Sequence, residues 1–466
     1  MSRFRARSGF DVPASDLWAW HLRRGAFERL NPGWDPAEVV DRGAGVSEGS
    51  QVVLRVRMGP LRRRWVARHR GLVEGREFRD DQVSGPFAHW SHAHRFLPAE
   101  RGGATLSDEI EYALPGGLPG ALIGGRLARA KLRRLFTWRH AVTRGDLLRH
   151  RGHPGKLRVA VSGAGGLVGS ALTAFLSTGG HEVVRMVRRP PTAADEVYYD
   201  PAAGEIDAQS FEGLDAVVHL AGENIAAGRW TPERKRRIRE SRVHGTRLVA
   251  EALAGLRDPP RVLINASAIG FYGDRGEEKL DETSSPGEGF LPEVCRAWEA
   301  AAEPAEQAGI RVVKLRIGVV LAAGGGALAK LLLPFSLGLG GPVGAGRQFM
   351  SWVALDDLVG AIHHLLYSEE VAGPVNAVAP APCRNRDFAL ALGRVLKRPA
   401  VLPTPAFLLR LALGEMAREL LLAGNRIYPA RLEASGFRFL RPELDPALRF
   451  ELGRLDPAAE RVELVT

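Results

Sequence analysis

Four side chains with useful chemistry lie in or shortly after one predicted strand. Ser267 ends the apolar run 261–267, Tyr272 follows it, and Cys295 and Glu299 lie one turn apart on a predicted helix. Open sheets bind ligands at the carboxyl ends of their strands, where such groups could orient a carbonyl or hydroxyl and move protons. Each group could instead serve packing or strand-end hydrogen bonding. Ser267, Tyr272, Cys295 and Glu299 are therefore candidate catalytic residues.

The strongest signal is a glycine-rich turn between a strand and a helix. The apolar run 157–162 ends at Gly163, which permits a tight turn. Gly166 allows a pyrophosphate to approach the backbone, and Gly169 allows the helix at 167–178 to pack closely. The free N–H groups of that helix attract phosphate. The pattern predicts a dinucleotide site formed by Gly163, Gly165, Gly166, Leu167, Val168 and Gly169.

Two arginines indicate which dinucleotide binds. Arg188 and Arg189 follow the second predicted strand, 182–187, where dinucleotide folds usually carry an acidic residue for the ribose. A guanidinium binds a 2′-phosphate that a carboxylate would repel. The sequence therefore predicts NADP(H), although both arginines could be solvated loop charges.

The surrounding pattern predicts an α/β fold. Strand and helix alternate between residues 156 and 400, as in a parallel sheet with helices on both faces. Strands are predicted at 157–162, 182–187, 215–220, 261–267, 311–316 and 374–378. Helices are predicted at 167–178, 232–255, 291–308, 326–334, 355–367 and 385–396.

The flanking segments predict two further parts. Residues 1–152 show one early helix, several strand-like pieces and a long basic helix at 122–148, which suggests an α+β helix-grip domain. Residues 149–155 are rich in helix breakers and predict a linker. The expected fold is a Rossmann-type doubly wound parallel sheet (156–400) with a small helical C-terminal domain (401–466), preceded by a ligand-binding domain (1–152).

The composition and the distribution of charge favour some classes of protein over others. The chain has 466 residues, 45% of them hydrophobic, two cysteines and a formal net charge of +11. Few cysteines and no signal-peptide pattern favour a cytoplasmic setting, and no transmembrane segment is predicted. The positive excess lies entirely in residues 1–156, but without aromatic interleaving, so no nucleic-acid partner is expected.

The N-terminal segment contains two histidines on one strand face. His92 and His94 alternate within the predicted strand 88–97 and would point the same way. Two imidazoles without a third ligand do not make a metal site, so no metal is predicted.

Seven segments, in order, resemble the epimerase-like branch of the extended short-chain dehydrogenase/reductase superfamily, also called NAD-dependent epimerase/dehydratase-like. They are 162–169, 220–225, 241–246, 267–274, 295–299, 315–321 and 350–358. The resemblance continues into a C-terminal domain of unknown function typical of this branch. Residues 1–150 more weakly resemble the polyketide cyclase/START-like superfamily, which implies a possible hydrophobic ligand.

The resemblance assigns positions around the cofactor. It implies pyrophosphate at the glycine turn, Arg188 near the 2′-phosphate, and Arg242 on the helix behind the cofactor. Val319 would border the nicotinamide. Under the ribose and nicotinamide linkage it places Leu220, Ala221 and Gly222.

The chain departs from the family at the catalytic pair. Working members use Tyr-x-x-x-Lys, whereas the corresponding helix here carries Cys295 and Glu299. None of the six tyrosines has lysine four residues later. A carboxylate beside a thiol raises the thiol pKa, so this pair inverts the usual chemistry.

The leading hypothesis is an NADP(H)-binding oxidoreductase or epimerase-like enzyme. It would act by hydride transfer on an unidentified small-molecule carbonyl or hydroxyl substrate, which Ser267 would orient. The alternatives are a catalytically silent NADP(H)-sensing module and a lipid or hydrophobic-ligand carrier that works through residues 1–152. The sequence does not indicate an oligomeric state.

Overall fold

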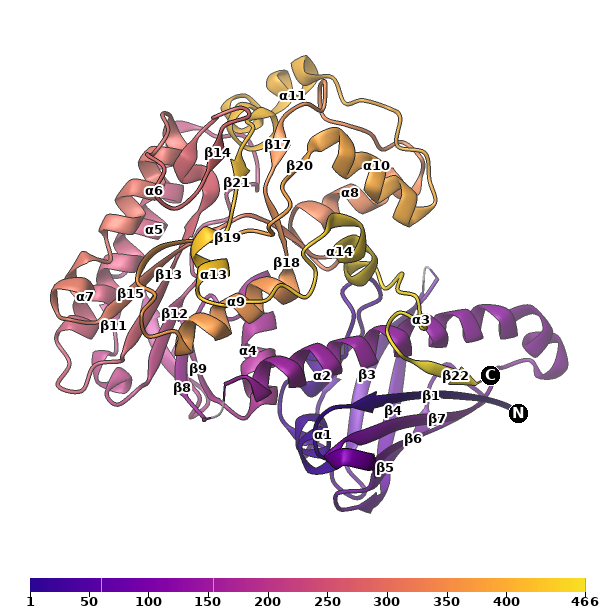
Figure 1. Cartoon of the computed structure of the whole chain (residues 1–466). Coiled ribbons are helices and arrows are strands. Elements are labelled where there is room, and N and C mark those ends of the chain that lie inside the picture. The colour runs from indigo at the N-terminus through magenta and orange to yellow at the C-terminus, as the bar shows by residue number, and fades with distance from the viewer. Residues whose placement is uncertain (60, 154, 466) are drawn as a thin grey trace. The chain divides into compact units, whose positions relative to one another are not determined.

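The polypeptide folds into two compact units, seen in the computed structural model of Figure 1. The first comprises Met1–Pro154, Ser177–Gly180 and Arg449–Thr466, and the second Gly155–Leu176 and His181–Leu448. The structure describes residues 1–59, 61–153 and 155–465, so Pro154 of the predicted linker lies outside the described residues.

The second unit is built on a sheet with the order β11-β10-β9-β8-β12-β13-β15-β19. All neighbouring strands are parallel except β10 and β11. The chain reverses its direction of winding between β8 and β12, which is the point where such sheets bind dinucleotides. The strands are β8 (Arg158–Ser162), β9 (Glu182–Val187), β10 (Glu196–Asp200), β11 (Glu205–Ile206), β12 (Ala216–His219), β13 (Val262–Ala268), β15 (Arg311–Ile317) and β19 (Gly373–Ala377).

Helices cover both faces of this sheet because its strands are apolar on both sides. On one face α4 (Leu167–Gly179) and α9 (Leu355–Tyr367) pack in one core with Val159 and Val161. On the other, α5 (Pro232–Ala254) and α7 (Glu303–Gln307) pack over Ala160. The predicted doubly wound α/β fold is confirmed.

Several elements of the second unit differ from the expected pattern. The helix predicted at 291–308 is divided into α6 (Phe290–Ala300) and α7, because Pro304 has no N–H for a continuous helix. Strand β10 was not predicted, although it extends the parallel sheet beyond β9.

Further helices and short strands follow between residues 279 and 451. They are β14 (Lys279–Leu280), β16 (Val319–Leu321), α8 (Gly326–Ser336), β17 (Phe349–Met350), β18 (Trp352–Ala354), β20 (Cys383–Arg384), α10 (Asn385–Leu396), α11 (Ala406–Leu413), α12 (Glu415–Ala417), β21 (Arg426–Ile427), α13 (Ala430–Ala434) and α14 (Leu444–Glu451). Strand β21 pairs with β14, so the predicted helical C-terminal part also contributes a strand.

The first unit contains an antiparallel sheet with the order β2-β3-β4-β5-β6-β7-β1-β22. Its helices are α1 (Ala14–Leu22), α2 (Ala26–Arg29) and α3 (Gly117–Arg151). The strands are β1 (Ser2–Phe10), β2 (Glu38–Asp41), β3 (Gln51–Met58), β4 (Leu61–Val73), β5 (Glu77–Ser84), β6 (His89–Pro98), β7 (Ala104–Ala113) and β22 (Glu463–Val465).

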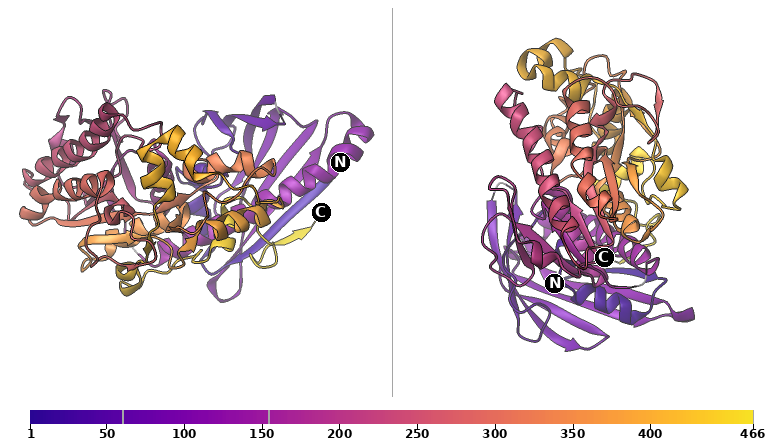
Figure 2. Two further views of the ribbon diagram at one scale, coloured as in Figure 1. Left: turned by 90° about the horizontal axis from the view of Figure 1, so that it is seen from above. Right: turned by 90° about the vertical axis from the view of Figure 1, so that its left-hand side faces the viewer.

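The long helix α3 lies along this sheet, as Figures 1 and 2 show. Leu132 and Phe136 of α3 are buried with Phe4 and Ile110 of the strands, which is the arrangement expected of a helix-grip fold. The extreme C-terminal strand β22 pairs with β1. The division into domains 1–152, 156–400 and 401–466 stays a prediction about parts that fold independently.

Candidate functional site

The glycine turn joins β8 to α4 with little room for side chains. Gly163 has a positive φ of 65°, and the Gly166 N–H donates to the Gly163 carbonyl at 2.8 Å. A Cβ on Gly169 would lie 2.2 Å from the Gly163 oxygen, whereas one on Gly165 would meet open space. The turn therefore requires glycine at 163 and 169, and it leaves bare backbone at the mouth of α4. Leu167 and Val168, both half-buried, begin that helix.

A buried serine at the end of β8 holds the residues that follow β12 beside this turn. Ser162 Oγ accepts the N–H groups of Leu220 (2.9 Å) and Ala221 (3.1 Å) and lies 2.8 Å from His219 Nδ1. The hydroxyl proton must point to His219, because both backbone groups are donors. The predicted ribose-binding segment is thus held beside the glycine turn, and Gly222 after it is exposed.

The two predicted phosphate-binding arginines have different surroundings. Arg189 makes two hydrogen bonds to Glu196, at 2.9 and 2.7 Å, and Arg185 also pairs with that carboxylate. Arg188 is exposed and makes no side-chain hydrogen bond or ion pair within the described ranges. Only Arg188 therefore presents an uncommitted guanidinium after β9.

The remaining cofactor candidates come from α5 and β16. Arg242 donates to the Ile238 carbonyl at 3.0 Å, and its guanidinium carbon lies 5.0 Å from the centre of the Trp298 ring. Burial lowers the Arg242 pKa. Val319 is half-buried, and its N–H donates to the Ser351 carbonyl at 2.9 Å. These contacts fix both residues without showing what they bind.

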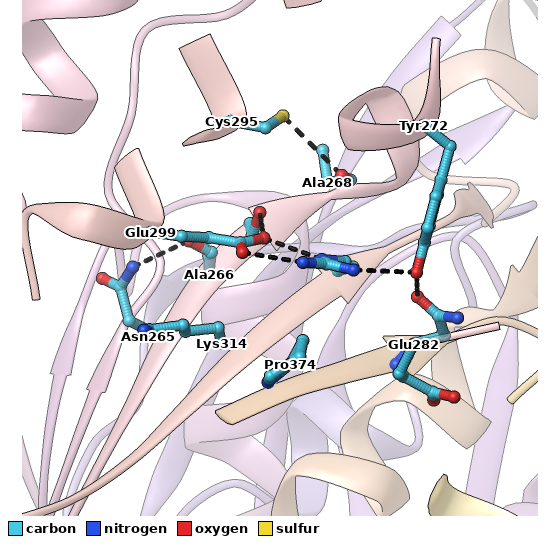
Figure 3. A network of polar contacts seen from close by, with 12 residues as sticks. Asn265, Ala266, Ala268, Tyr272, Glu282, Cys295, Glu299, Lys314 and Pro374 are labelled. Atoms are coloured by element: carbon cyan, nitrogen blue, oxygen red, sulfur yellow. Dashed lines mark hydrogen bonds and ion pairs between the residues drawn. The ribbon is translucent and has the colours of Figure 1, made fainter. Parts of the chain in front are cut away.

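Three of the four catalytic candidates share one buried network, which Figure 3 shows from close by. Ser267 Oγ donates to Glu299 Oε1 at 2.7 Å. Arg316, on β15, donates two hydrogen bonds to the same carboxylate, at 2.8 and 2.9 Å. Its third contact, 2.9 Å long, is to the Tyr272 hydroxyl. A single guanidinium therefore joins Glu299 to Tyr272.

Tyr272 is held at its hydroxyl by several partners. The oxygen lies 2.8 Å from Asn376 Oδ1 and 3.0 Å from the Asp281 carbonyl, in addition to Arg316. Burial raises the Tyr272 pKa, and the neighbouring guanidinium of Arg316 opposes this only in part. The phenol is consequently a poor proton donor at neutral pH in this arrangement.

Cys295 lies outside this network. Its Sγ faces the Ala268 carbonyl at 3.7 Å, as Figure 3 shows. Burial, followed by the Glu299 carboxylate, raises the thiol pKa to about 12. The direction agrees with the effect expected of a Cys–Glu pair, and the thiol is not a nucleophile at neutral pH.

Sequence reasoning missed Arg316. The residue lies in the segment 315–321, but nothing in the sequence pattern shows that this position of β15 lies next to Glu299 on α6. The available signal was Glu299 itself, because a carboxylate on a buried helix face requires a cation or several donors. Because Arg316 pairs with that carboxylate, its positive charge opposes in part the effect of Glu299 on the Cys295 pKa.

Comparison with known proteins agrees with this fold. The NAD dependent epimerase/dehydratase family model matches residues 159–377. An epimerase family protein of Mycobacterium tuberculosis is 43% identical over 296 residues, which cover 64% of this chain and 98% of that protein. This chain belongs to the epimerase family. Two other models match it, polyketide cyclase/dehydrase and lipid transport at 10–135 and a domain of unknown function, DUF1731, at 404–451.

Solved structures of epimerase-family proteins resemble the chain closely. A nucleoside-diphosphate sugar epimerase from Corynebacterium glutamicum is 34% identical with a TM-score of 0.81, covering 98% of this chain and 92% of that one. The human epimerase family protein SDR39U1, solved with NADPH, is 36% identical with a TM-score of 0.60. It covers 64% of this chain and all of its own. Among the described residues of this epimerase-family chain, no helix is long and apolar enough to cross a bilayer.

Proposed function

We propose that this epimerase-family protein binds NADP(H) at the β8–α4 turn and catalyses hydride transfer to or from a small carbonyl or hydroxyl compound. The observation that carries the proposal is the glycine turn, where any Cβ at position 169 would strike the backbone while position 165 faces open space. Bare N–H groups at a helix start suit a pyrophosphate. A bound nicotinamide would supply the hydride chemistry.

The preference for the phosphorylated cofactor rests on Arg188. It is exposed and uncommitted, whereas Arg189 is engaged with Glu196. A guanidinium offers bidentate bonds to a phosphate monoester. The presence of NADPH in the structure of human SDR39U1 supports the same choice.

The chain's own residues restrict how a proton could move. Ser267 is the candidate that orients the substrate oxygen, and its own proton is directed to Glu299. Tyr272, Cys295 and Glu299 remain candidates only if the network rearranges when substrate binds, since each already has a partner in the described structure. Tyr272 and Cys295 also have raised pKa values.

This closed network favours a second candidate function, an NADP(H)-sensing module without turnover. Four polar side chains that could act on a substrate are 7% exposed or less: Ser267, Tyr272, Cys295 and Glu299. An enzyme would have to open this region, whereas a sensor would not.

Cofactor titration tests the proposed binding. The full chain should bind NADPH more tightly than NADH, and Arg188→Glu should remove that preference by weakening NADPH alone, by about tenfold or more. Arg189→Glu is the poorer probe because it breaks the pair with Glu196. Arg239→Glu, which changes an exposed arginine on α5, is a matched charge control. Equal affinities for both cofactors in the unaltered chain would contradict the assignment.

Turnover separates the enzyme from the sensor. Oxidation of NADPH is followed with a panel of aldehydes, ketones and nucleotide sugars. Turnover that falls in Ser267→Ala, with NADPH affinity retained, supports hydride transfer. Binding without any turnover supports the sensing module.

A further inference from the structure

The first unit contains a cluster of imidazoles and carboxylates on the sheet face that α3 covers. Asp80 on β5 is paired in register with His92 on β6, and His94 follows two residues later on the same strand face. The His92 ring lies 5.3 Å from the ring of Phe136 on α3, which places the cluster under that helix. The sequence shows two histidines, and only the pairing of β5 with β6 adds the carboxylate.

Three ligand atoms converge at the distances expected around one metal ion. Asp80 Oδ2 lies 3.1 Å from His92 Nδ1 and 3.5 Å from His94 Nε2. One possible ligand atom from each of the three residues lies within 4.8 Å of those of the other two. Ligands bound at roughly 2.0–2.2 Å around a tetrahedral ion are separated by roughly 3.3–3.5 Å. The 3.5 Å separation matches that value, and the 3.1 Å separation is a few tenths of an ångström shorter.

The second nitrogen of each imidazole faces a shared carboxylate. Asp108 Oδ1, on β7, lies 3.0 Å from His92 Nε2 and 2.6 Å from His94 Nδ1. Its other oxygen is 2.7 Å from His140 Nε2, on α3. Metal-bound histidines characteristically present their other ring nitrogen to a carboxylate, which fixes the tautomer and the ring orientation. Asp108, with a side chain only 4% exposed, hydrogen bonds to His92 Nε2 and lies close to His94 Nδ1, where the geometry does not form a hydrogen bond.

A further imidazole points into the cluster. His69 on β4 is 8% exposed, and its Nδ1 has no hydrogen-bond partner among the described residues. That nitrogen lies 3.8 Å from Asp80 Oδ1. A buried, unsatisfied ring nitrogen is costly in a closed interior unless it meets an ion, a water or a ligand.

We propose that Asp80, His92 and His94 bind one divalent first-row transition-metal ion of the Zn²⁺ class, with Asp108 positioning both imidazoles. Two imidazoles and one carboxylate suit such ions, and oxygen-preferring Ca²⁺ or Mg²⁺ is disfavoured. Three protein ligands leave a coordination position for water or for an oxygen of a bound molecule. The site lies in the first unit and does not depend on the NADP(H) proposal.

Metal titration of the full chain tests this site. Protein stripped with a chelator should bind one equivalent of Zn²⁺, and one equivalent of Co²⁺ should give visible absorption typical of nitrogen and oxygen ligands. Zn²⁺ should also raise the thermal unfolding midpoint, because an ion that binds only the folded state stabilises it. Failure of the unaltered protein to bind either ion stoichiometrically would overturn the proposal, whatever its variants do.

Substitutions place the ion. Asp80→Asn and His94→Gln should each weaken Zn²⁺ binding at least a hundredfold. Asp108→Asn should weaken it about 10- to 100-fold, as loss of an outer partner does. His89→Gln changes a histidine of the same strand outside the cluster and should leave affinity unchanged. Stoichiometric binding that survives both Asp80→Asn and His94→Gln in folded protein would locate the ion elsewhere and refute the assignment.

Discussion

The buried pair of Glu299 and Arg316 is the decisive feature at the scale of single residues. The resemblance predicts lysine where this chain has Glu299, so a cation is replaced by an anion. Arg316 restores a positive charge from β15, at 4% exposure, and hydrogen bonds to both oxygens of the carboxylate. The pair is therefore electrically neutral where the family pattern carries a net positive charge. The proton chemistry of Tyr-x-x-x-Lys is not reproduced, because the guanidinium does not release a proton.

Removing Arg316 should destabilise the second unit strongly. Arg316→Met leaves the Glu299 carboxylate buried without a cation, which costs about 3–5 kcal/mol. Arg316→Met combined with Glu299→Gln should recover most of that loss, since no charge is left unpaired. Urea unfolding monitored by tryptophan fluorescence measures both effects.

Lys314→Met provides the matched control for this experiment. Lys314 is on the same strand and pairs with the half-exposed Glu306 at 2.9 Å. Loss of such a surface pair costs under about 1 kcal/mol. If Arg316→Met were no more destabilising than Lys314→Met, the buried pair would not have the structural weight assigned to it.

At the scale of elements, the junction of β8 with β12 depends on a neutral histidine. His219 is fully buried, and its Nδ1 accepts the Ser162 hydroxyl, whose lone pairs already receive two backbone N–H groups. A protonated ring would present a second donor to that hydroxyl. Burial lowers the His219 pKa to about 4. The strand ends that frame the predicted cofactor site are therefore joined best when this ring carries no charge.

This depressed pKa predicts an acid-sensitive contribution to stability. Between pH 6.5 and about 4 the unfolded chain binds a proton at His219 that the folded chain does not. The contribution is therefore present above pH 6.5 and falls by up to about 1.4 kcal/mol per pH unit below it. His219→Asn, which keeps an acceptor for Ser162, should reduce the slope of unfolding free energy against pH in this window. An identical slope in both proteins, measured by urea unfolding, would contradict the expectation.

At the scale of the whole molecule, the two ends of the chain meet in one sheet. Strand β22 pairs with β1 through Arg5 and Val465, Ala6 and Leu464, and Arg7 and Glu463. Val462 before it is buried in the same core as Phe136 of α3. The first unit is therefore completed by residues that follow the entire second unit, and its sheet edge is covered by the C-terminal strand.

Deleting residues 462–466 should destabilise the first unit and expose β1. Loss of Val462 and Leu464 removes about 2–4 kcal/mol of apolar burial, and a bared edge strand favours aggregation. Differential scanning calorimetry and light scattering measure these effects. Glu463→Ala, which changes an exposed side chain of β22 and keeps the strand, is the control. A truncated chain that melts like the control would show that β22 adds little.

The sequence by itself determined most long strands, most helices and the glycine turn, because periodic apolar patterns and the demands of a tight turn are local properties. It also assigned the chain to its family through seven ordered segments. Only the tertiary structure determined which polar residues contact one another. Arg316 meets Glu299, and Asp80 meets His92 and His94, because neighbouring strands and helices bring together positions that are 17, 12 and 14 residues apart. Such contacts depend on strand order and register, which no local pattern specifies.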